Sequence, residues 1–138
     1  MRALSTAIYS RLNGDATLAG FLGTTASVPS IFTKRPVPTG AGYPLILATT
    51  VVADVDQDFI ASPMRQISRD IAVYGMLATH FDKVVDAAER VRVLFHRQPL
   101  AFTGWRALDV IAAGPIDAPA EPQEIGRIVT LTMRLHPV

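Results

Sequence analysis

The sequence predicts an α+β fold, in which helices pack across a mostly antiparallel sheet. Segments with a helical hydrophobic period open the chain and recur once in its second half, whereas strand-like segments lie in two groups on either side of that later helix. Short turns and Pro-rich loops join the strands, which favours hairpins over the crossovers of a parallel sheet. The 138 residues, of which 49% are hydrophobic and 18% charged, are expected to form a single domain over 1–138.

Two short helices are expected at the start of the chain. Leu4, Ile8 and Leu12 are spaced i, i+4 and i+8, which predicts an amphipathic helix over residues 2–12. Asp15 is then placed to cap a second helix, "ATLAGFLG", because an aspartate side chain accepts a hydrogen bond from a free amide of the first turn. The apolar residues of both helices are expected to face the core.

A short strand, a loop and a long hairpin are predicted next. "SIFTKR" is the short strand, and the Pro- and Gly-rich "PVPTGAGYP" is an exposed loop. "LILATTVVA" is nearly continuous in apolar character, which predicts a central strand covered on both faces. "QISRDIAVYG" is the returning strand, and the polar stretch before it contains the turn signal Ser62-Pro63. We therefore expect residues 45–75 to form one long hairpin whose tip projects beyond the sheet.

A long helix and two further strands complete the predicted fold, in the order α-α-β-β-β-α-β-β. Apolar residues at helical spacing predict a helix from about Thr79 to Arg97. A strand around "GWRALDVIA" and a Pro-rich loop follow, and the closing strand "RIVTLTMRLH" alternates with a period of two. The side chains expected to face the core are Phe81, Val84, Val85, Ala88, Val91, Leu94 and Phe95 on the helix, and Val129, Leu131, Met133 and Leu135 on the closing strand.

The long helix also carries a polar cluster of His80, Asp82, Asp86 and Glu89. Histidine and carboxylates are the residue types of metal sites and of general acid–base catalysis. On a helix, however, His80 and Asp86 point to different sides and do not converge readily on one ion. We therefore interpret the cluster as the solvated face of the helix.

The charges on this helix have spacings that stabilise helical structure. Thr79, followed three residues later by Asp82, resembles a capping box, and acidic groups in a first turn favour the helix dipole. Further along, spacings of four and three residues place acidic and basic side chains next to one another on the surface. The expected ion pairs are Asp86–Arg90 and Glu89–Arg92.

Asp54, Asp56 and Asp58 form a D-x-D-x-D motif, which is how a calcium-binding loop begins. The rest of such a loop is missing. Phe59 stands at the sixth position, where glycine is needed, and Arg65 stands at the twelfth, where glutamate is needed. The sequence therefore does not support a calcium site.

The same three aspartates have a second interpretation on the predicted hairpin. Residues spaced by two in an extended arm project from the same face. Arg65 and Arg69 lie on the returning arm, where they could pair with the acidic arm or with a neighbouring subunit. The candidate subunit-interface residues are thus Asp54, Asp56, Asp58, Arg65 and Arg69, and a solvated hairpin tip is the alternative.

The rest of the sequence contains no recognisable catalytic, metal or cofactor site. The chain has no cysteine, which excludes disulfides and thiolate ligands. His80, His96 and His136 lie on separate elements, and neither G-x-x-x-x-G-K nor G-x-S-x-G occurs. Trp105, beside Arg106, could stack on a base or on a partner surface, but a lone Trp in such a strand more often packs in the core or at an interface. We therefore expect no enzyme activity and no cofactor.

Charge and hydropathy argue against two kinds of partner. The formal net charge of +1 gives no overall attraction to nucleic acid or to a membrane surface. The most apolar run, "PLILATTVVA", has about half the length needed to span a bilayer, and the N-terminus makes a poor signal peptide. We expect a soluble protein that is made in the cytoplasm and does not associate with a membrane.

Four stretches follow one another in a moderately specific order and span nearly the whole chain. They are the helix pair "ALSTAIYSRLNGDATLAGFLG", the strand–loop–strand "SIFTKRPVPTGAGYPLILA", the strand "RDIAVYG" followed at once by the helix "THFDKVVDAAERVRVLF", and the closing strand "RIVTLTMRL". In this order the chain resembles the tail terminator, or tail-completion, proteins of long-tailed (siphovirus-like) bacteriophages, prophages and gene transfer agents.

The resemblance implies a structural role in the neck of a virion. Proteins of this family are small α+β domains that form a ring, usually hexameric, on the last ring of the tail tube. The ring stops tube growth and offers a surface to the capsid connector or stopper protein, while DNA only passes through the lumen. The family has no catalytic residues, and its members are made in the host cytoplasm. This chain departs from the common pattern in its acidic-to-basic hairpin over residues 54–69.

Three alternatives stay open. Another neck component, such as a head-completion or stopper protein, would bind the portal side instead of tube protein. A small-ligand-binding α+β module would need a concave pocket with convergent polar groups. A nucleic-acid binder would need a basic face, which the net charge does not suggest.

Overall fold

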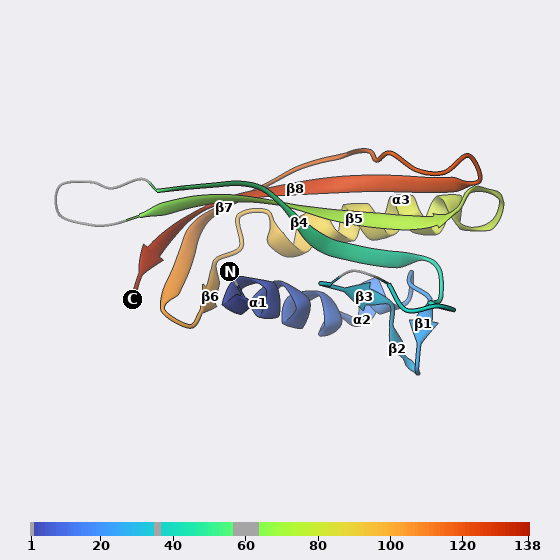
Figure 1. Cartoon of the computed structure of the whole chain (residues 1–138), viewed down its shortest axis with the longest axis horizontal. Coiled ribbons are helices and arrows are strands. Elements are labelled where there is room, and N and C mark those ends of the chain that lie inside the picture. The colour runs from blue at the N-terminus through green and yellow to red at the C-terminus, as the bar shows by residue number, and fades with distance from the viewer. Residues whose placement is uncertain (1, 35–36, 57–63) are drawn as a thin grey trace.

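The computed structural model of the chain describes residues 2–34, 37–56 and 64–138. These residues form three helices and eight strands (Figure 1), which confirms the α+β class with a mostly antiparallel, curled sheet and one long helix. The helices are α1 (Arg2–Asn13), α2 (Ala16–Ala19) and α3 (Leu77–Phe95). The strands are β1 (Thr24–Thr25), β2 (Val28–Pro29), β3 (Ile31–Phe32), β4 (Leu45–Asp56), β5 (Arg65–Met76), β6 (Leu100–Phe102), β7 (Trp105–Asp117) and β8 (Glu124–Pro137).

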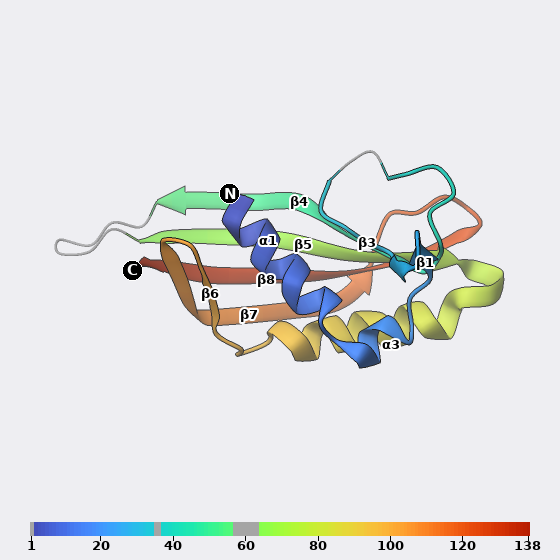
Figure 2. The same ribbon diagram turned by 90° about the horizontal axis from the view of Figure 1, so that it is seen from below.

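Six of the strands form one sheet in the order β3-β4-β5-β8-β7-β6. All neighbours are antiparallel except β3 and β4, which run parallel. α1 and α3 lie against the same face of this sheet (Figure 2), with α1 contacting β3, β4 and β6, and α3 contacting β5, β8 and β7. The short strands β1 and β2 form a separate hairpin.

The core lies between this face of the sheet and the helices. β5 and β8 pair in register along the whole of β5, from Arg65↔Leu135 to Met76↔Glu124. The alternation predicted for the closing strand is confirmed from Val129 to Leu135, where every second residue is buried under the helices. The main buried side chains are Leu4, Ile8 and Leu12 of α1, Val84, Ala87, Ala88, Val91 and Phe95 of α3, and Val129, Leu131, Met133 and Leu135 of β8.

β4 lies between β3 and β5 only at its start, so the prediction of a central strand is correct there and wrong for the rest of its length. In the described part of the chain, β4 pairs with β3 only at Ile46–Leu47, and residues 48–56 pair with β5 alone. The ladder shifts by one residue after Val51, and the adjacent side chains of Val51 and Val52 are 50% and 54% exposed. A continuous apolar run is consistent with a buried strand, but it does not specify which neighbours that strand has.

β4 and β5 form a long antiparallel pair whose described arms belong to the sheet. The pairing runs from the start of β4 to Asp56↔Arg65, and at Arg65 β5 is still paired on its other side with Leu135 of β8. The expected tip, residues 57–63, lies outside the described residues, so the projection of a tip beyond the sheet stays a prediction.

α3 begins directly at the end of β5, slightly earlier than predicted. Its N-cap is Met76, whose backbone N–H donates to His80 Nδ1 at 3.0 Å. The capping box expected from Thr79 and Asp82 is therefore wrong, because the helix has already begun before Thr79. Gly75 permits this tight junction, since a Cβ there would lie 2.8 Å from the His80 Cβ.

The buried stripe of α3 is narrower than the predicted one. Phe81 is 46% exposed and does not belong to the core, whereas Ala87, which the prediction left out, is fully buried. The stripe centres on Val84, Ala88 and Val91, as expected. Small residues such as Ala87 let the helix approach the sheet closely, which a hydrophobicity pattern does not reveal.

Candidate functional site

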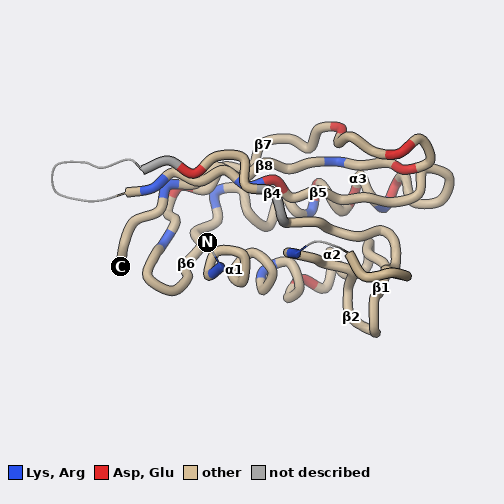
Figure 3. Tube along the Cα trace, viewed as in Figure 1, with Lys and Arg blue, Asp and Glu red and all other residues tan. Residues whose placement is uncertain are grey.

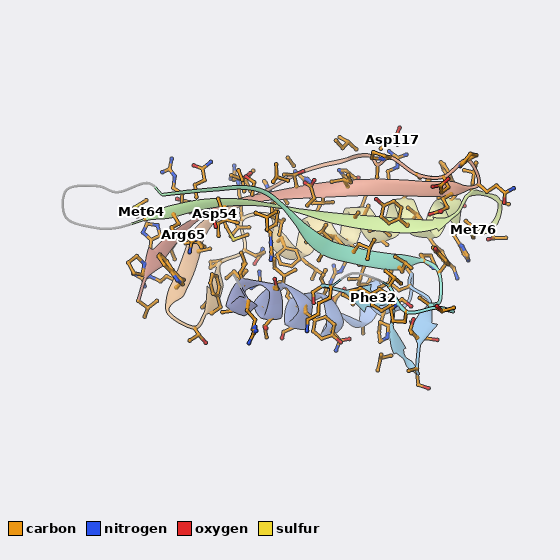
Figure 4. All side chains as sticks on the ribbon, viewed as in Figure 1. Phe32, Asp54, Met64, Arg65, Met76 and Asp117 are labelled. Carbon is orange, nitrogen blue, oxygen red and sulfur yellow. The ribbon has the colours of Figure 1, made fainter. Side chains whose placement is uncertain are left out.

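The structure brings Asp54 and Arg65 together across β4 and β5 (Figure 4). Arg65 donates from Nε to Asp54 Oδ1 at 3.2 Å and from Nη2 to Oδ2 at 2.5 Å, and its guanidinium lies 5.8 Å from the centre of the partly buried Trp105 ring. Pairing across the two arms is one of the possibilities that the sequence left open. Because the two side chains are 29% and 36% exposed, this ion pair contributes little to stability.

Asp54 alone of the acidic triplet forms such a contact among the described side chains. Asp56 pairs with Arg65 in the backbone ladder, and Asp58 lies outside the described residues. In the described ranges, no group of three or more His, Asp or Glu side chains could hold a metal ion. The role of the triplet at a subunit interface therefore stays a prediction.

Arg69 lies in the core instead of on the surface. It is 5% exposed, because it shares the helix-facing side of β5 with Ile67 and Ile71. Its Nη1 donates to Ser5 Oγ of α1 at 3.0 Å, its Nη2 donates to the same oxygen, and its Nε has no hydrogen-bond partner among the described residues. Burial lowers the pKa of this guanidinium from its usual value. Arg69 therefore does not pair with the acidic arm.

A hollow of about 450 Å³ adjoins Ser5, the hydrogen-bond acceptor of Arg69. It lies between α1 and the segment that follows β3, and we call it the basic hollow because its charged residues, Arg2 and Lys34, are both cations. Figure 3 shows basic residues along α1, apart from the acidic residues of α3 and of the β7–β8 connection. The full lining is Arg2, Ser5, Thr6, Tyr9, Thr33 and Lys34.

The polar cluster of α3 forms the outer face of the helix. Asp82, Asp86 and Glu89 are exposed on the side opposite the buried stripe, and none of them pairs with a cation within the described residues. His80 Nδ1 accepts a hydrogen bond from the Met76 backbone N–H at the start of the helix. This placement favours the interpretation as a solvated face.

No helix in the described ranges, α3 included, is long and apolar enough to cross a membrane.

Arg90 forms an ion pair with Asp15, so the predicted pairing with Asp86 is wrong. Arg90 Nε and Nη2 donate to the two oxygens of Asp15, both at 2.8 Å. Asp15 also caps α2, as predicted, by accepting the Leu18 N–H at 2.8 Å. The hydrogen bond from Arg90 holds the pKa of Asp15 below its usual value, even though burial acts in the opposite direction. The contact ties α2 to α3.

The β7 edge of the sheet is covered by its own chain. β6 pairs with the first residues of β7, and the connection after α3 then occupies the edge. Arg97 N–H donates to the Val110 carbonyl at 2.8 Å, and Ala112 N–H donates to His96 Nδ1 at 3.2 Å. This contact explains His96, for which the sequence offered no role. Covering an edge in this way prevents another strand from pairing there.

The β4 edge, residues 48–56, lacks such a cover in the described part of the chain. Its outward backbone groups form no hydrogen bond with any other described segment. The exposed side chains of Val51 and Val52 flank these groups. An open, apolar edge is a surface to which a strand of another chain can add. The sequence does not reveal this edge, because its continuous apolar run predicts a central strand.

Comparison with known proteins gives a match by fold only. The sequence matches no protein-family model and no curated protein. Among solved structures, it is similar to a chain of the "Virion of native gene transfer agent (GTA) particle", with a TM-score of 0.80 and 18% sequence identity. The match covers 98% of this chain and 96% of that chain. The two chains therefore share one fold over nearly their full lengths.

Proposed function

We propose that this chain is a structural virion protein, which forms a hexameric ring on the tail tube, ends tube polymerisation and provides the tail side of the head–tail joint. The observation that carries the proposal is the fold shared with a chain of a gene transfer agent virion. The match covers nearly the full length of both chains. The sequence resemblance to tail terminator proteins, which rests on the order of four stretches, is independent support.

A structural role also fits the way in which the polar residues are used. His80 and His96 accept backbone amides, and Asp15 caps one helix while binding another. These groups hold elements together, and they are not gathered around a pocket as catalytic groups would be. We therefore propose no enzyme activity and no cofactor.

The β4 edge is the surface that we assign to subunit contact. A ring requires heterologous contacts, in which one patch meets a different patch of the next subunit. Of the two edges of the sheet, the β4 edge is open and the β7 edge is covered in the described part of the chain. A strand of the next subunit can therefore add at one edge alone, which suits a heterologous contact. Asp54 lies near the far end of this edge and binds Arg65 of the neighbouring strand β5. We assign both to the proposed interface, together with Asp56 and Asp58, which follow in sequence. Arg69 is buried, so we do not assign it to this surface; its contact with Ser5 holds α1 under the sheet.

The remaining partners follow from the proposed place in the particle. One face of the ring contacts the tail-tube protein, and the other contacts the capsid connector or stopper protein, while DNA passes through the lumen. The protein is made in the host cytoplasm and is incorporated at the neck without a membrane step.

Mass photometry of the chain, alone and with its tail-tube protein, tests ring formation. We expect a species of hexamer size or a complex that stacks on tubes. A monomer under both conditions contradicts the proposal. The same experiment with the portal-side protein identifies the alternative, since a stopper or head-completion protein would bind that partner and leave tubes uncapped.

A matched pair of variants tests the β4 edge. Val52→Lys introduces a charge at the open edge, whereas Val93→Lys introduces the same charge at an equally exposed valine on α3. We expect Val52→Lys to reduce the assembled fraction strongly and Val93→Lys to leave it unchanged, because a lysine on an edge strand opposes strand addition. Equal assembly of the two variants would exclude this edge from the interface.

A further inference from the structure

A buried positive charge, with no counter-ion among the residues that the structure describes, lies beside the basic hollow. Within the described residues, Arg69 has the Ser5 hydroxyl as its hydrogen-bond acceptor, and its Nε has no partner. A hydroxyl is neutral and does not balance the charge. Removing a guanidinium from water is costly unless an anion compensates for the lost hydration. The described part of the fold therefore leaves this charge uncompensated beneath α1.

Three carboxylates of the described chain are engaged with other partners. Asp70 follows Arg69 but points to the opposite face of β5, where Thr130 Oγ1 donates to it at 2.6 Å. Asp54 and Asp15 bind other arginines. None of these three carboxylates is available to Arg69, which leaves room for an anion from outside the described residues to neutralise it.

The basic hollow is where such an anion can approach. Ser5 accepts from Arg69 and also lines the hollow, so the buried charge lies directly behind the hollow wall. Arg2 and Lys34 add two charges at the rim, and Tyr9 and Thr33 add hydroxyls. Because low-dielectric protein separates Arg69 from the hollow, its field is less screened there than it would be in water.

We propose that the basic hollow binds an oxyanion of the phosphate class, with Arg2 and Lys34 in direct contact and Arg69 acting through Ser5. Cationic groups and hydroxyls that approach from α1 and from the segment after β3 suit an anion with several acceptor oxygens. Inorganic phosphate and the phosphodiester of a nucleic-acid strand present the same chemistry. The proposal concerns the single chain and does not depend on ring formation.

Thermal unfolding of the full chain tests the site. Midpoints are compared in sodium phosphate and in sodium chloride at equal pH and ionic strength. A ligand that binds the folded state alone raises the midpoint with a saturable concentration dependence. We expect this response to phosphate and none to chloride. Equal midpoints in the two salts at every concentration would overturn the proposal.

The two lysines of the chain provide a matched pair of variants. Lys34 lines the hollow, whereas Lys83 is exposed on α3. We expect Lys34→Ala to raise the apparent Kd for phosphate about tenfold, and Lys83→Ala to leave it unchanged. An unchanged Kd in Lys34→Ala would place phosphate elsewhere and overturn the assignment. Arg69→Met is expected to lose the response as well, and the lysine pair keeps the test valid if that variant does not fold.

Fluorescence anisotropy with a short single-stranded oligodeoxynucleotide distinguishes the two sources of phosphate. If the natural ligand is a phosphodiester, the oligonucleotide binds, and both Lys34→Ala and added inorganic phosphate weaken its binding. If the ligand is a free anion, the oligonucleotide does not bind while phosphate still stabilises the chain. Oligonucleotide binding that is insensitive to both changes would overturn the phosphodiester source.

Discussion

Arg69 and Arg90 each tie a helix to another element, but only Arg90 does so with a carboxylate. Arg90 lies near the surface, where Asp15 binds it through two hydrogen bonds. Arg69 lies in the core face of β5, where the Ser5 hydroxyl is its acceptor. Within the described residues, the surface pair is electrostatically complete, whereas the buried arginine has no carboxylate partner. The same residue type is thus a local brace in one region, and in the other it is the buried charge to which we assign the proposed anion.

Charge reversal at Arg69 is expected to have the largest effect. Arg69→Glu places a carboxylate in the core without any donor other than Ser5, and we expect the free energy of unfolding to fall by about 3 kcal/mol or more. Urea denaturation measures this change. A loss below about 1 kcal/mol would mean that the site is open to water, and the contrast with Arg90 would disappear. Charge reversal at Arg69 is consequently a poor probe of subunit contacts, because it acts on the folded monomer.

Removal of the Asp15 carboxylate is expected to have an intermediate effect. Asp15→Ala abolishes the cap of α2 and the acceptor of Arg90, and the lost cap alone should reduce the free energy of unfolding by about 1–2 kcal/mol. Asp86→Ala is the matched control on the outer face of α3, where we expect a change within about 0.5 kcal/mol. Equal losses in the free energy of unfolding in the two variants would contradict the Asp15–Arg90 contact and favour the predicted Asp86–Arg90 pair.

The pH dependence of stability sharpens the same contrast. The pKa of Asp15 is lower in the folded chain than in the unfolded chain, chiefly because Arg90 donates to it. Its contribution is therefore fully present above the unfolded pKa of about 4 and is lost as the pH falls through the folded pKa. We expect the difference in unfolding midpoint between the natural chain and Asp15→Asn to shrink steadily from pH 5 to lower values. A difference in midpoint that is constant over this range would show that the hydrogen bond from Arg90 does not lower the pKa of Asp15 in the folded chain.

The smallest effect is expected at the exposed pair of Arg65 and Asp54. Arg65→Ala should lower the free energy of unfolding by about 1 kcal/mol or less, because both side chains are partly hydrated. Added salt should reduce this difference further, since it screens exposed charges. Denaturation at low and high sodium chloride measures both quantities. A larger loss that salt does not affect would indicate that packing against Trp105, and not the ion pair, holds Arg65.

Predictions from the sequence succeeded where the pattern involves residues a few positions apart. Asp15 caps α2 as expected, and the alternation of the closing strand correctly identifies its buried face. The capping box predicted at Thr79 is wrong, because β5 passes directly into α3 and the N-cap is Met76. The short strands β1, β2 and β6 were missed because two or three residues carry too little periodicity.

For the candidate site, the sequence identified the right residue types but not their partners. For Arg65 the sequence left open pairing across the hairpin or with a neighbouring subunit, and in the structure Arg65 binds Asp54. Arg69, four positions later on the same strand, was assigned to the same surface and is buried under α1. Alternation alone puts both arginines on one face of β5, and only the position of α1 makes one of them internal.

Short-range patterns were sufficient for the α+β class, the buried face of β8 and the cap of α2, because hydrogen bonds and hydrophobic periods over a few residues decide them. Tertiary structure alone decided that β4 lies at an edge, that Arg90 binds a residue 75 positions away and that Arg69 meets Ser5 beside the basic hollow. These features depend on which segments come to lie next to one another. That choice follows from the packing of the whole core, which no single stretch of sequence contains.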